Sequence, residues 1–176
     1  MNEEVWKEFN YNPLSHSEAH YLMTLHELEE RKGYARATDI ARALSISIPS
    51  CTQSLKKLLK KNLVQINEDK FYLLTHKGRK EVLLVEKNKE ILLTFFHNIL
   101  GVSYEQSDTD SCKIEHLLSP ETSHRFCQFM GLMQSGRTET ETLKQLLNET
   151  KHPNYCNQKD CENCPHNKKI PTTLTI

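Results

Sequence analysis

Residues 34–56 constrain the fold of this chain more than any other stretch. In their first half, apolar residues recur at helical spacing and predict a short helix over residues 37–44: Ile40, Ala41 and Leu44. A second helix is expected to begin near Ser47, because Pro49 suits a first helical turn, where its missing N–H needs no partner. Two short helices joined by a tight turn are typical of a helix-turn-helix, a motif that enters the major groove of DNA.

The second of these helices is expected to have one apolar face and one polar face. Its apolar side chains are Leu55, Leu58 and Leu59, and its polar ones are Ser50, Thr52, Gln53 and Lys56. Gln suits an adenine edge, while Ser, Thr and Lys suit phosphates or bases. The predicted DNA-contacting residues are Arg36, Ser47, Pro49, Ser50, Thr52, Gln53 and Lys56. The alternative is an ordinary solvated helix face.

The distribution of charge supports the DNA-binding interpretation. The chain as a whole has a formal net charge of +0, but residues 13–80 hold 12 Lys/Arg against 7 Asp/Glu, a net charge of +5. Residues 81–176 hold 10 against 13, a net charge of −3. The basic charge therefore falls on the segment with the helix-turn-helix, as neutralisation of DNA phosphates requires.

The segments on either side extend the motif. Ser15, followed three residues later by Glu18, predicts a capped helix start, and Gly33 predicts the end of that helix. Residues 63–66 and 70–75 favour strands with a polar turn between them. A hairpin directly after the helix that begins near Ser47 makes this region a winged helix-turn-helix.

The rest of the chain is predicted to be largely helical. A long helix over about residues 76–100 carries an apolar stripe too wide for the surface of a monomer, which indicates burial between domains or subunits. Further helices are expected over residues 105–117, 120–133 and 138–149. The predicted fold class is mainly α with a small β-wing.

Several classes of protein are excluded by what the sequence lacks. No run approaches the roughly 18–20 apolar residues of a membrane span, and residues 1–20 show no basic-then-apolar leader. We therefore expect a cytoplasmic protein whose six cysteines are reduced and available for metal or redox chemistry. Gly-rich phosphate loops, nucleophile elbows and paired catalytic acids are not recognisable, so neither an enzyme nor a small-molecule substrate is expected.

Three of the cysteines are grouped near the C-terminus, in a segment with few large apolar residues. They are Cys156, Cys161 and Cys164. Their C-x4-C-x2-C spacing, followed by Pro165, favours iron–sulfur ligation, with Cys112 or Cys127 as a fourth ligand. His152 and His166 are near enough to complete a zinc site instead. Three unligated thiols are a third interpretation.

Several local motifs together resemble the diphtheria toxin repressor family of metal-dependent regulators, in particular its manganese-sensing branch. They are HYL at 20–22 with ELEE at 27–30, KGYARATDIA at 32–41, PSCT at 49–52, LTHKG at 74–78 and CKIEHLLS at 112–119. The resemblance covers residues 14–133 and excludes the cysteine-rich tail. It implies a homodimer that binds a palindromic operator on double-stranded DNA when metal-loaded, and that represses iron or manganese uptake.

The sequence and the resemblance together predict four segments. An N-terminal tail over residues 1–13 is followed by a winged-helix DNA-binding domain over residues 14–78. A helical dimerisation and metal-sensing domain over residues 79–150 comes next. The cysteine-rich tail, over residues 151–176, is expected to bind a metal or a cluster.

The family's metal ligands, transferred position by position, give a changed set in this chain. The first-helix positions fall on His20 and Met23, and the Glu-His pair of a later helix falls on Glu115 and His116, with Cys112 one turn earlier. Residues 112, 115 and 116 are expected on one helical face. The family's histidine on the long helix falls on Lys89, beside Asn88, and lysine at neutral pH has no lone pair to offer. His97 is one candidate to replace it.

The predicted metal ligands are therefore His20, Cys112, Glu115 and His116, with the three tail cysteines. This set is softer than a carboxylate-rich manganese site and favours iron, as Fe2+ or an iron–sulfur cluster, or zinc over manganese. We predict an iron-responsive transcriptional regulator. One alternative is an iron–sulfur electron-transfer protein that uses its winged helix for protein contacts. Another is a repressor that senses Mn2+ or Zn2+ and has a structural zinc tail.

Overall fold

The computed structural model describes residues 14–149, and the predicted cysteine site of the tail lies outside them. The first part of the described chain is a winged helix. Its helices are α2 (His16–Lys32), α3 (Ala37–Ala43) and α4 (Ile48–Lys60), and its wing is β1 (Val64–Ile66) paired antiparallel with β2 (Tyr72–Leu74). The expected helix-turn-helix and hairpin are therefore confirmed.

Local capping explains where these helices begin and end. Ser15 and Glu18 form the predicted capping box, in which the Ser15 N–H donates to Glu18 Oε2 at 2.9 Å and the Glu18 N–H donates to Ser15 Oγ at 3.3 Å. Gly33 ends α2 with a φ of 77°, a left-handed conformation that glycine adopts without strain. Ser47 caps α4 by accepting a hydrogen bond from the Ser50 N–H, and Pro49 lies in its first turn.

A hydrophobic core holds the winged helix together. Each element contributes buried side chains to it, among them Leu22 and Leu25 of α2, Ile40 of α3, Leu55 and Leu58 of α4 and Val64 of β1. Val82 and Val85, from the next helix, complete the same core. The winged helix is thus packed on the first turns of the segment that leads away from it.

The second part of the described chain is helical throughout. Its elements are α5 (His76–Thr94), the π-helical segment η1 (Phe95–Ile99), α6 (Tyr104–Ile114), α7 (Pro120–Met133) and α8 (Thr138–Glu149). The single helix expected over residues 76–100 therefore changes its hydrogen-bonding pattern at Phe95. Within residues 14–149, no helix is long and apolar enough to cross a membrane.

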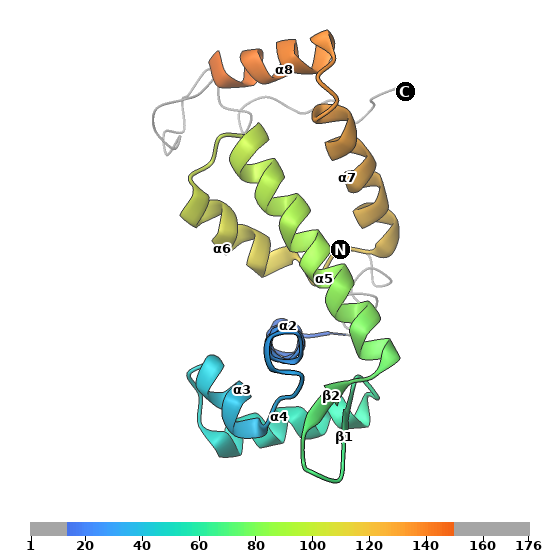
Figure 1. Ribbon diagram of the computed structural model, residues 1–176. Coiled ribbons are helices and arrows are strands. Elements are labelled where there is room, and N and C mark those ends of the chain that lie inside the picture. The colour runs from blue at the N-terminus through green and yellow to red at the C-terminus, as the bar shows by residue number, and fades with distance from the viewer. Residues whose placement is uncertain (1–13, 150–176) are drawn as a thin grey trace, which may run out of the picture.

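The long helix α5 connects the two parts of the molecule. In Figure 1 it rises from the wing, at the bottom of the view, to the upper part, where α6 and α7 flank it and α8 lies across the top. Contacts of α5 with α2, α6 and α7 are consistent with this arrangement. A second, smaller apolar cluster forms there around Ile91, Met130 and Met133. The turn after α6 is thereby brought next to the start of α2.

Candidate metal centre and DNA-binding surface

The start of α4 presents the predicted recognition residues to solvent. Ser47, Pro49, Ser50, Gln53 and Lys56 are exposed. Thr52 is half-buried, and its hydroxyl donates to the Ile48 carbonyl at 2.9 Å, which leaves only its acceptor capacity for a ligand. Cys51, in contrast, is fully buried in the core of the winged helix.

Arg36 is held between the helix-turn-helix and the wing. Its guanidinium lies 5.1 Å from the centre of the Phe71 ring, and Phe71 packs in turn on Tyr34 at a centroid distance of 4.6 Å. This contact orients the arginine without burying it, since Arg36 remains exposed. The cation is therefore available to a phosphate beside the recognition helix.

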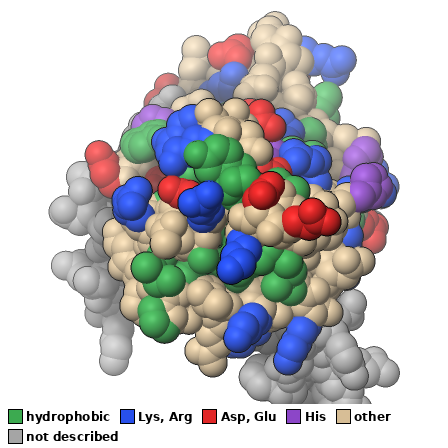
Figure 2. Space-filling view, turned by 60° about the horizontal axis from the view of Figure 1, so that its bottom comes forward, with side chains coloured by type: hydrophobic (Ala, Val, Ile, Leu, Met, Phe, Trp, Pro, Cys, Tyr) green, Lys and Arg blue, Asp and Glu red, His purple; other side chains and the backbone are tan. Residues whose placement is uncertain are grey.

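Sequence reasoning missed an apolar part of this surface. Ile46 and Ile48, on either side of the α4 cap, are 37% and 51% exposed. Figure 2 looks onto the end of the molecule that carries α3, α4 and the wing, and shows Lys and Arg side chains spread over it with hydrophobic side chains exposed between them. Mixed basic and apolar character suits a DNA groove, where apolar side chains contact thymine methyl groups.

Helices α2 and α6 meet at a cluster of metal-binding side chains. His20 Nε2 of α2 lies 3.1 Å from Cys112 Sγ of α6, although the two residues are 92 positions apart in the sequence. His16, which the sequence analysis did not select, joins them, and one ligand atom each from His16, His20 and Cys112 lie within 4.8 Å of one another. Such a grouping of nitrogen and sulfur atoms is typical of a site for a transition-metal ion.

Glu115 lies near this cluster, since burial and then the charge of Glu115 raise the pKa of Cys112, although the Glu115 oxygens are not among the ligand atoms that lie within 4.8 Å of one another. The residue is fully buried, and neither of its carboxyl oxygens has a hydrogen-bond partner among the described residues. Burial raises the pKa of Glu115 to about 7. Because an ionised carboxylate is costly to bury without a partner, a bound cation would stabilise its charged form, so the residues present fit a divalent metal ion.

His116 lies on the other side of His16, with ring centroids 5.2 Å apart. Burial lowers the pKa of His116, and the neighbouring His16 and His20 lower it further. Burial likewise lowers the pKa of His20, with His16 and Lys89 adding to the effect. Both rings are thereby favoured in the neutral form, which is the form that binds a metal.

The long helix contributes a cation to this region in place of a ligand. Lys89 Nζ forms an ion pair with Asp108 at 3.1 Å, and its neighbour Asn88 donates from Nδ2 to the Glu115 carbonyl at 2.8 Å. Asn88 Oδ1 is buried and has no partner among the described residues. Lys89 is therefore paired with Asp108, and its charge also acts on Glu115 and Cys112.

Other candidates are not brought into the cluster. Met23 packs on the core of the winged helix, and His97 Nδ1 lies 2.9 Å from the Val102 carbonyl. The expectation that residues 112, 115 and 116 share one helical face is wrong in detail, because α6 ends at Ile114 and His116 lies in the following turn. The predicted ligands Cys156, Cys161 and Cys164 lie outside the described residues.

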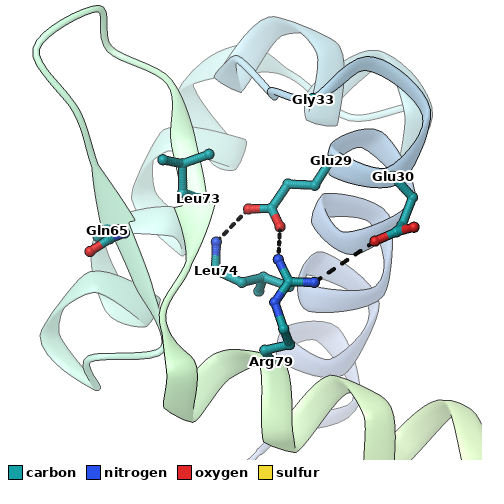
Figure 3. A pocket seen from close by; sticks show the side chains of 7 residues that line it. All are labelled: Glu29, Glu30, Gly33, Gln65, Leu73, Leu74 and Arg79. Atoms are coloured by element: carbon teal, nitrogen blue, oxygen red, sulfur yellow. Dashed lines mark hydrogen bonds and ion pairs between the residues drawn. The ribbon is translucent and has the colours of Figure 1, made fainter.

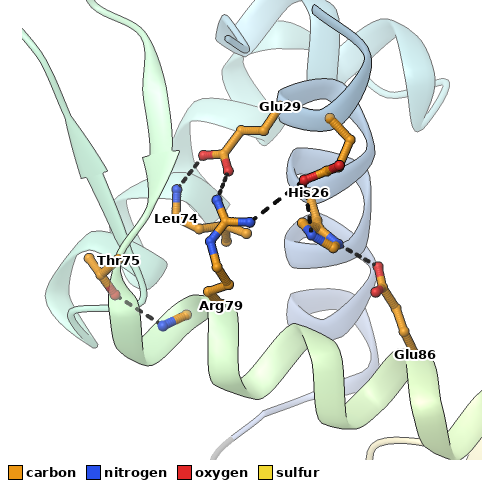
Figure 4. A network of polar contacts seen from close by, with 8 residues as sticks. His26, Glu29, Leu74, Thr75, Arg79 and Glu86 are labelled. Carbon is orange, nitrogen blue, oxygen red and sulfur yellow. Dashed lines mark hydrogen bonds and ion pairs between the residues drawn. The ribbon is translucent and has the colours of Figure 1, made fainter. Parts of the chain in front are cut away.

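A polar network on the opposite side of α2 ties the two parts of the molecule together. Glu29 accepts from the Leu74 N–H and from Arg79, both at 2.6 Å, at the edge of an open pocket of about 340 Å³ (Figure 3). A second contact joins α2 to α5, where His26 Nδ1 lies 2.9 Å from Glu86 Oε1 (Figure 4). These contacts fix the wing and the start of α5 against α2.

An exposed recognition helix in a winged helix, joined to a helical domain at a cluster of metal-binding side chains, defines a metal-responsive DNA-binding regulator. Two family models match: the iron dependent repressor N-terminal DNA binding domain at residues 13–71, and the iron dependent repressor metal binding and dimerisation domain at residues 75–138. The HTH-type transcriptional regulator MntR of Bacillus subtilis (strain 168) is 31% identical over 134 residues, which are 76% of this chain and 94% of that protein. The chain belongs to the diphtheria toxin repressor family and is a metal-dependent transcriptional repressor, not an enzyme.

Solved structures support the same relationship. The manganese regulator SloR is 27% identical with a TM-score of 0.58, and ScaR with bound Zn2+ is 28% identical with a TM-score of 0.55. The matches cover 65% and 64% of this chain and 53% of each of those chains. The chain thus spans about half the length of these structural relatives.

Proposed function

We propose that this protein is a homodimeric repressor that binds a palindromic operator in the cytoplasm in response to iron, and that it controls genes of metal uptake. The observation that carries the proposal is the contact of His20 with Cys112 at 3.1 Å, with the fully buried Glu115 and its neighbour His116 three and four positions after Cys112. These residues would hold a divalent ion. Residues 14–78 would form the DNA-binding domain and residues 79–150 the dimerisation and metal-sensing domain.

The proposed control acts through the angle between these two domains. His20 belongs to α2 of the winged helix, whereas Cys112, Glu115 and His116 belong to α6 and the turn after it. Bound metal favours the conformation in which the two groups of ligands lie together, and so shifts the population towards that conformation. In a dimer this would set the separation of the two recognition helices, which must match the spacing of the operator half-sites.

Iron is proposed over manganese because of the donor atoms. Thiolate and imidazole ligands suit iron or zinc, while manganese is better served by carboxylates and carbonyl groups. Manganese is the metal named for SloR and zinc is the metal bound in ScaR, so these two ions are the competing candidates. Iron bound as a cluster with Cys156, Cys161 and Cys164 is the other form of the proposal, and sulfide analysis of protein purified without oxygen tests it.

The test of the proposal is operator binding as a function of metal. Affinity for a palindromic duplex selected by the protein itself should rise with added Fe2+ and fall steeply with salt. His116→Ala should abolish the metal dependence without unfolding the protein. His124→Ala is the matched control, since His124 is exposed on α7 and hydrogen-bonds to Gln128, and it should behave as the wild type. Unchanged metal dependence in His116→Ala would contradict the site assignment.

A further inference from the structure

His16 is the side chain in the cluster that the family-based ligand positions do not account for. It is the first residue of α2, one helical turn before His20, and both residues face α6. Its ring lies edge-on to His20 with centroids 4.5 Å apart, and tilted against His116 at 5.2 Å. The ligand atoms of His16, His20 and Cys112 thus lie within 4.8 Å of one another, and the His116 ring packs against His16.

The charges of these groups suit a divalent ion. Two anionic donors are available when a cation binds, the Cys112 thiolate and the Glu115 carboxylate, and together they neutralise one divalent ion. The nearest positive side chain, Lys89, is already paired with Asp108 at 3.1 Å. The remaining donors, His16, His20 and His116, are neutral ligands that add no further charge.

We propose that His16 is a direct ligand of the metal ion, and that with His20 and Cys112 it makes a nitrogen- and sulfur-rich site that selects Fe2+, Co2+ or Zn2+ over Mn2+. This inference rests on the proposed metal-responsive function. It adds a ligand from the first turn of α2 and assigns the metal preference to it. The neighbouring helix α5 supplies Lys89, which has no lone pair when protonated, so His16 provides a donor that α5 does not.

Anaerobic titration with Co2+ and Mn2+ tests the inference without any DNA. The protein is the full chain with Cys156, Cys161 and Cys164 changed to Ser, so that tail thiols do not contribute, and the unmodified chain is titrated in parallel. Co2+ reports the ligand set through the intensity of its visible bands and through sulfur-to-cobalt charge transfer in the near ultraviolet. Mn2+ competition gives the ratio of the two affinities.

We compare His16→Ala with Cys112→Ser and with the control His124→Ala. His16→Ala should lower the Co2+ affinity at least about tenfold, alter the visible bands and narrow the preference for Co2+ over Mn2+. Cys112→Ser should remove the charge-transfer band, and His124→Ala should match its parent. Folding should persist in His16→Ala, because His16 is exposed at the start of a helix, and circular dichroism checks this.

The outcomes distinguish a failure of the proposed role of His16 from a failure of the proposed metal-responsive function. Parental Co2+ affinity and visible bands in His16→Ala, with the charge-transfer band lost in Cys112→Ser, would overturn the role of His16 and leave the proposed metal site in place. Unchanged binding in His16→Ala, Cys112→Ser and His116→Ala together would overturn both.

Discussion

Glu18 stabilises the winged helix by joining the start of α2 to the end of α4. Its carboxylate accepts from the Ser15 N–H at 2.9 Å and from Lys61 Nζ at 2.7 Å. Burial acts to raise the pKa of Glu18, but the hydrogen bonds from Lys61 and Ser15 outweigh it and hold the pKa below its usual value of 4.5. The charged form is therefore the one that stabilises the fold.

Replacing this carboxylate should give a pH-dependent loss of stability. We expect Glu18→Gln to lower the free energy of unfolding by about 1 kcal/mol near neutral pH. The glutamine amide can still accept a hydrogen bond from the Ser15 N–H, but it has no charge to pair with Lys61. The folded pKa is depressed, so the advantage of the wild type is present above pH 4.5 and disappears as the pH falls through the folded value. Urea unfolding at several pH values measures this convergence.

The control for this experiment is an exposed ion pair on the same helix. Glu27 lies 3.6 Å from Arg31, and both side chains are largely exposed, at 71% and 60%. Glu27→Gln should change stability little at any pH. If the free energies of unfolding of the wild type and Glu18→Gln still differed at acidic pH, the charge of Glu18 would not be the cause of the difference.

Two exposed residues of α4 should affect DNA binding in different ways. Gln53→Ala should cost about 1–3 kcal/mol on the preferred operator and much less on an unrelated duplex, because a base contact carries sequence information. Lys56→Ala should weaken both duplexes alike and reduce the salt slope by about 1, because a phosphate contact carries none. Fluorescence anisotropy at several salt concentrations measures both. Equal losses on the two duplexes from Gln53→Ala would reassign Gln53 to the DNA backbone.

At the scale of the elements, the close crossing of α5 over the segment that follows α4 depends on a glycine. Gly78 is buried in the first turn of α5, its N–H donates to Thr75 Oγ1 at 3.0 Å, and an added Cβ would collide with the Leu63 carbonyl. The Thr75 N–H donates to that same carbonyl at 3.1 Å. Only glycine lets the start of α5 lie this close to the beginning of the wing.

Gly78→Ala should therefore be strongly destabilising. We expect a loss of about 2–4 kcal/mol, because the collision is with main-chain atoms that cannot move aside cheaply. The matched control is Gly131→Ala in α7, where an added Cβ meets no atom of residues 14–149 within 4 Å and alanine favours the helix. Thermal unfolding of the two variants measures the difference. Equal melting temperatures for both variants would mean that α5 can shift without cost.

At the scale of the whole molecule, the upper helices carry apolar side chains that the described part of the protomer leaves exposed. Phe129 and Leu132 of α7 are 39% and 53% exposed, and Leu143 of α8 is 43% exposed. The same helix α7 also packs Met130 and Met133 into the second core. The matching family model is that of a metal binding and dimerisation domain, so this surface is where we expect the second protomer to bind.

A charge placed on this surface should separate the protomers. We expect Leu132→Glu to shift the protein from dimer to monomer in analytical ultracentrifugation, and to lower affinity for a full palindrome far more than for a single half-site. Gln128→Glu is the control, because it adds the same charge to α7 at a side chain that is already polar and exposed. A Leu132→Glu protein that remained dimeric would place the interface on another surface.

The winged helix could be predicted almost completely from the sequence. The caps at Ser15 and Ser47 and the Gly33 stop are interactions between residues at most four positions apart, so the local sequence encodes them. The apolar spacing of α3 and α4 fixed which faces are buried. Four of the residues that meet or adjoin the cluster, His20, Cys112, Glu115 and His116, were found only because they match family positions, and their role as ligands stays a prediction.

Only the tertiary structure brought His16 to His20 and Cys112, and showed that Glu115 is fully buried with no partner for its carboxyl oxygens within residues 14–149. From the sequence alone, His16 is predicted only to be a polar residue in the first turn of a helix. Its place beside α6 depends on how α2 and α6 both pack on α5. Local preferences determined the elements of this protein, but the long-range packing of those elements decided that His16, His20 and Cys112 lie together.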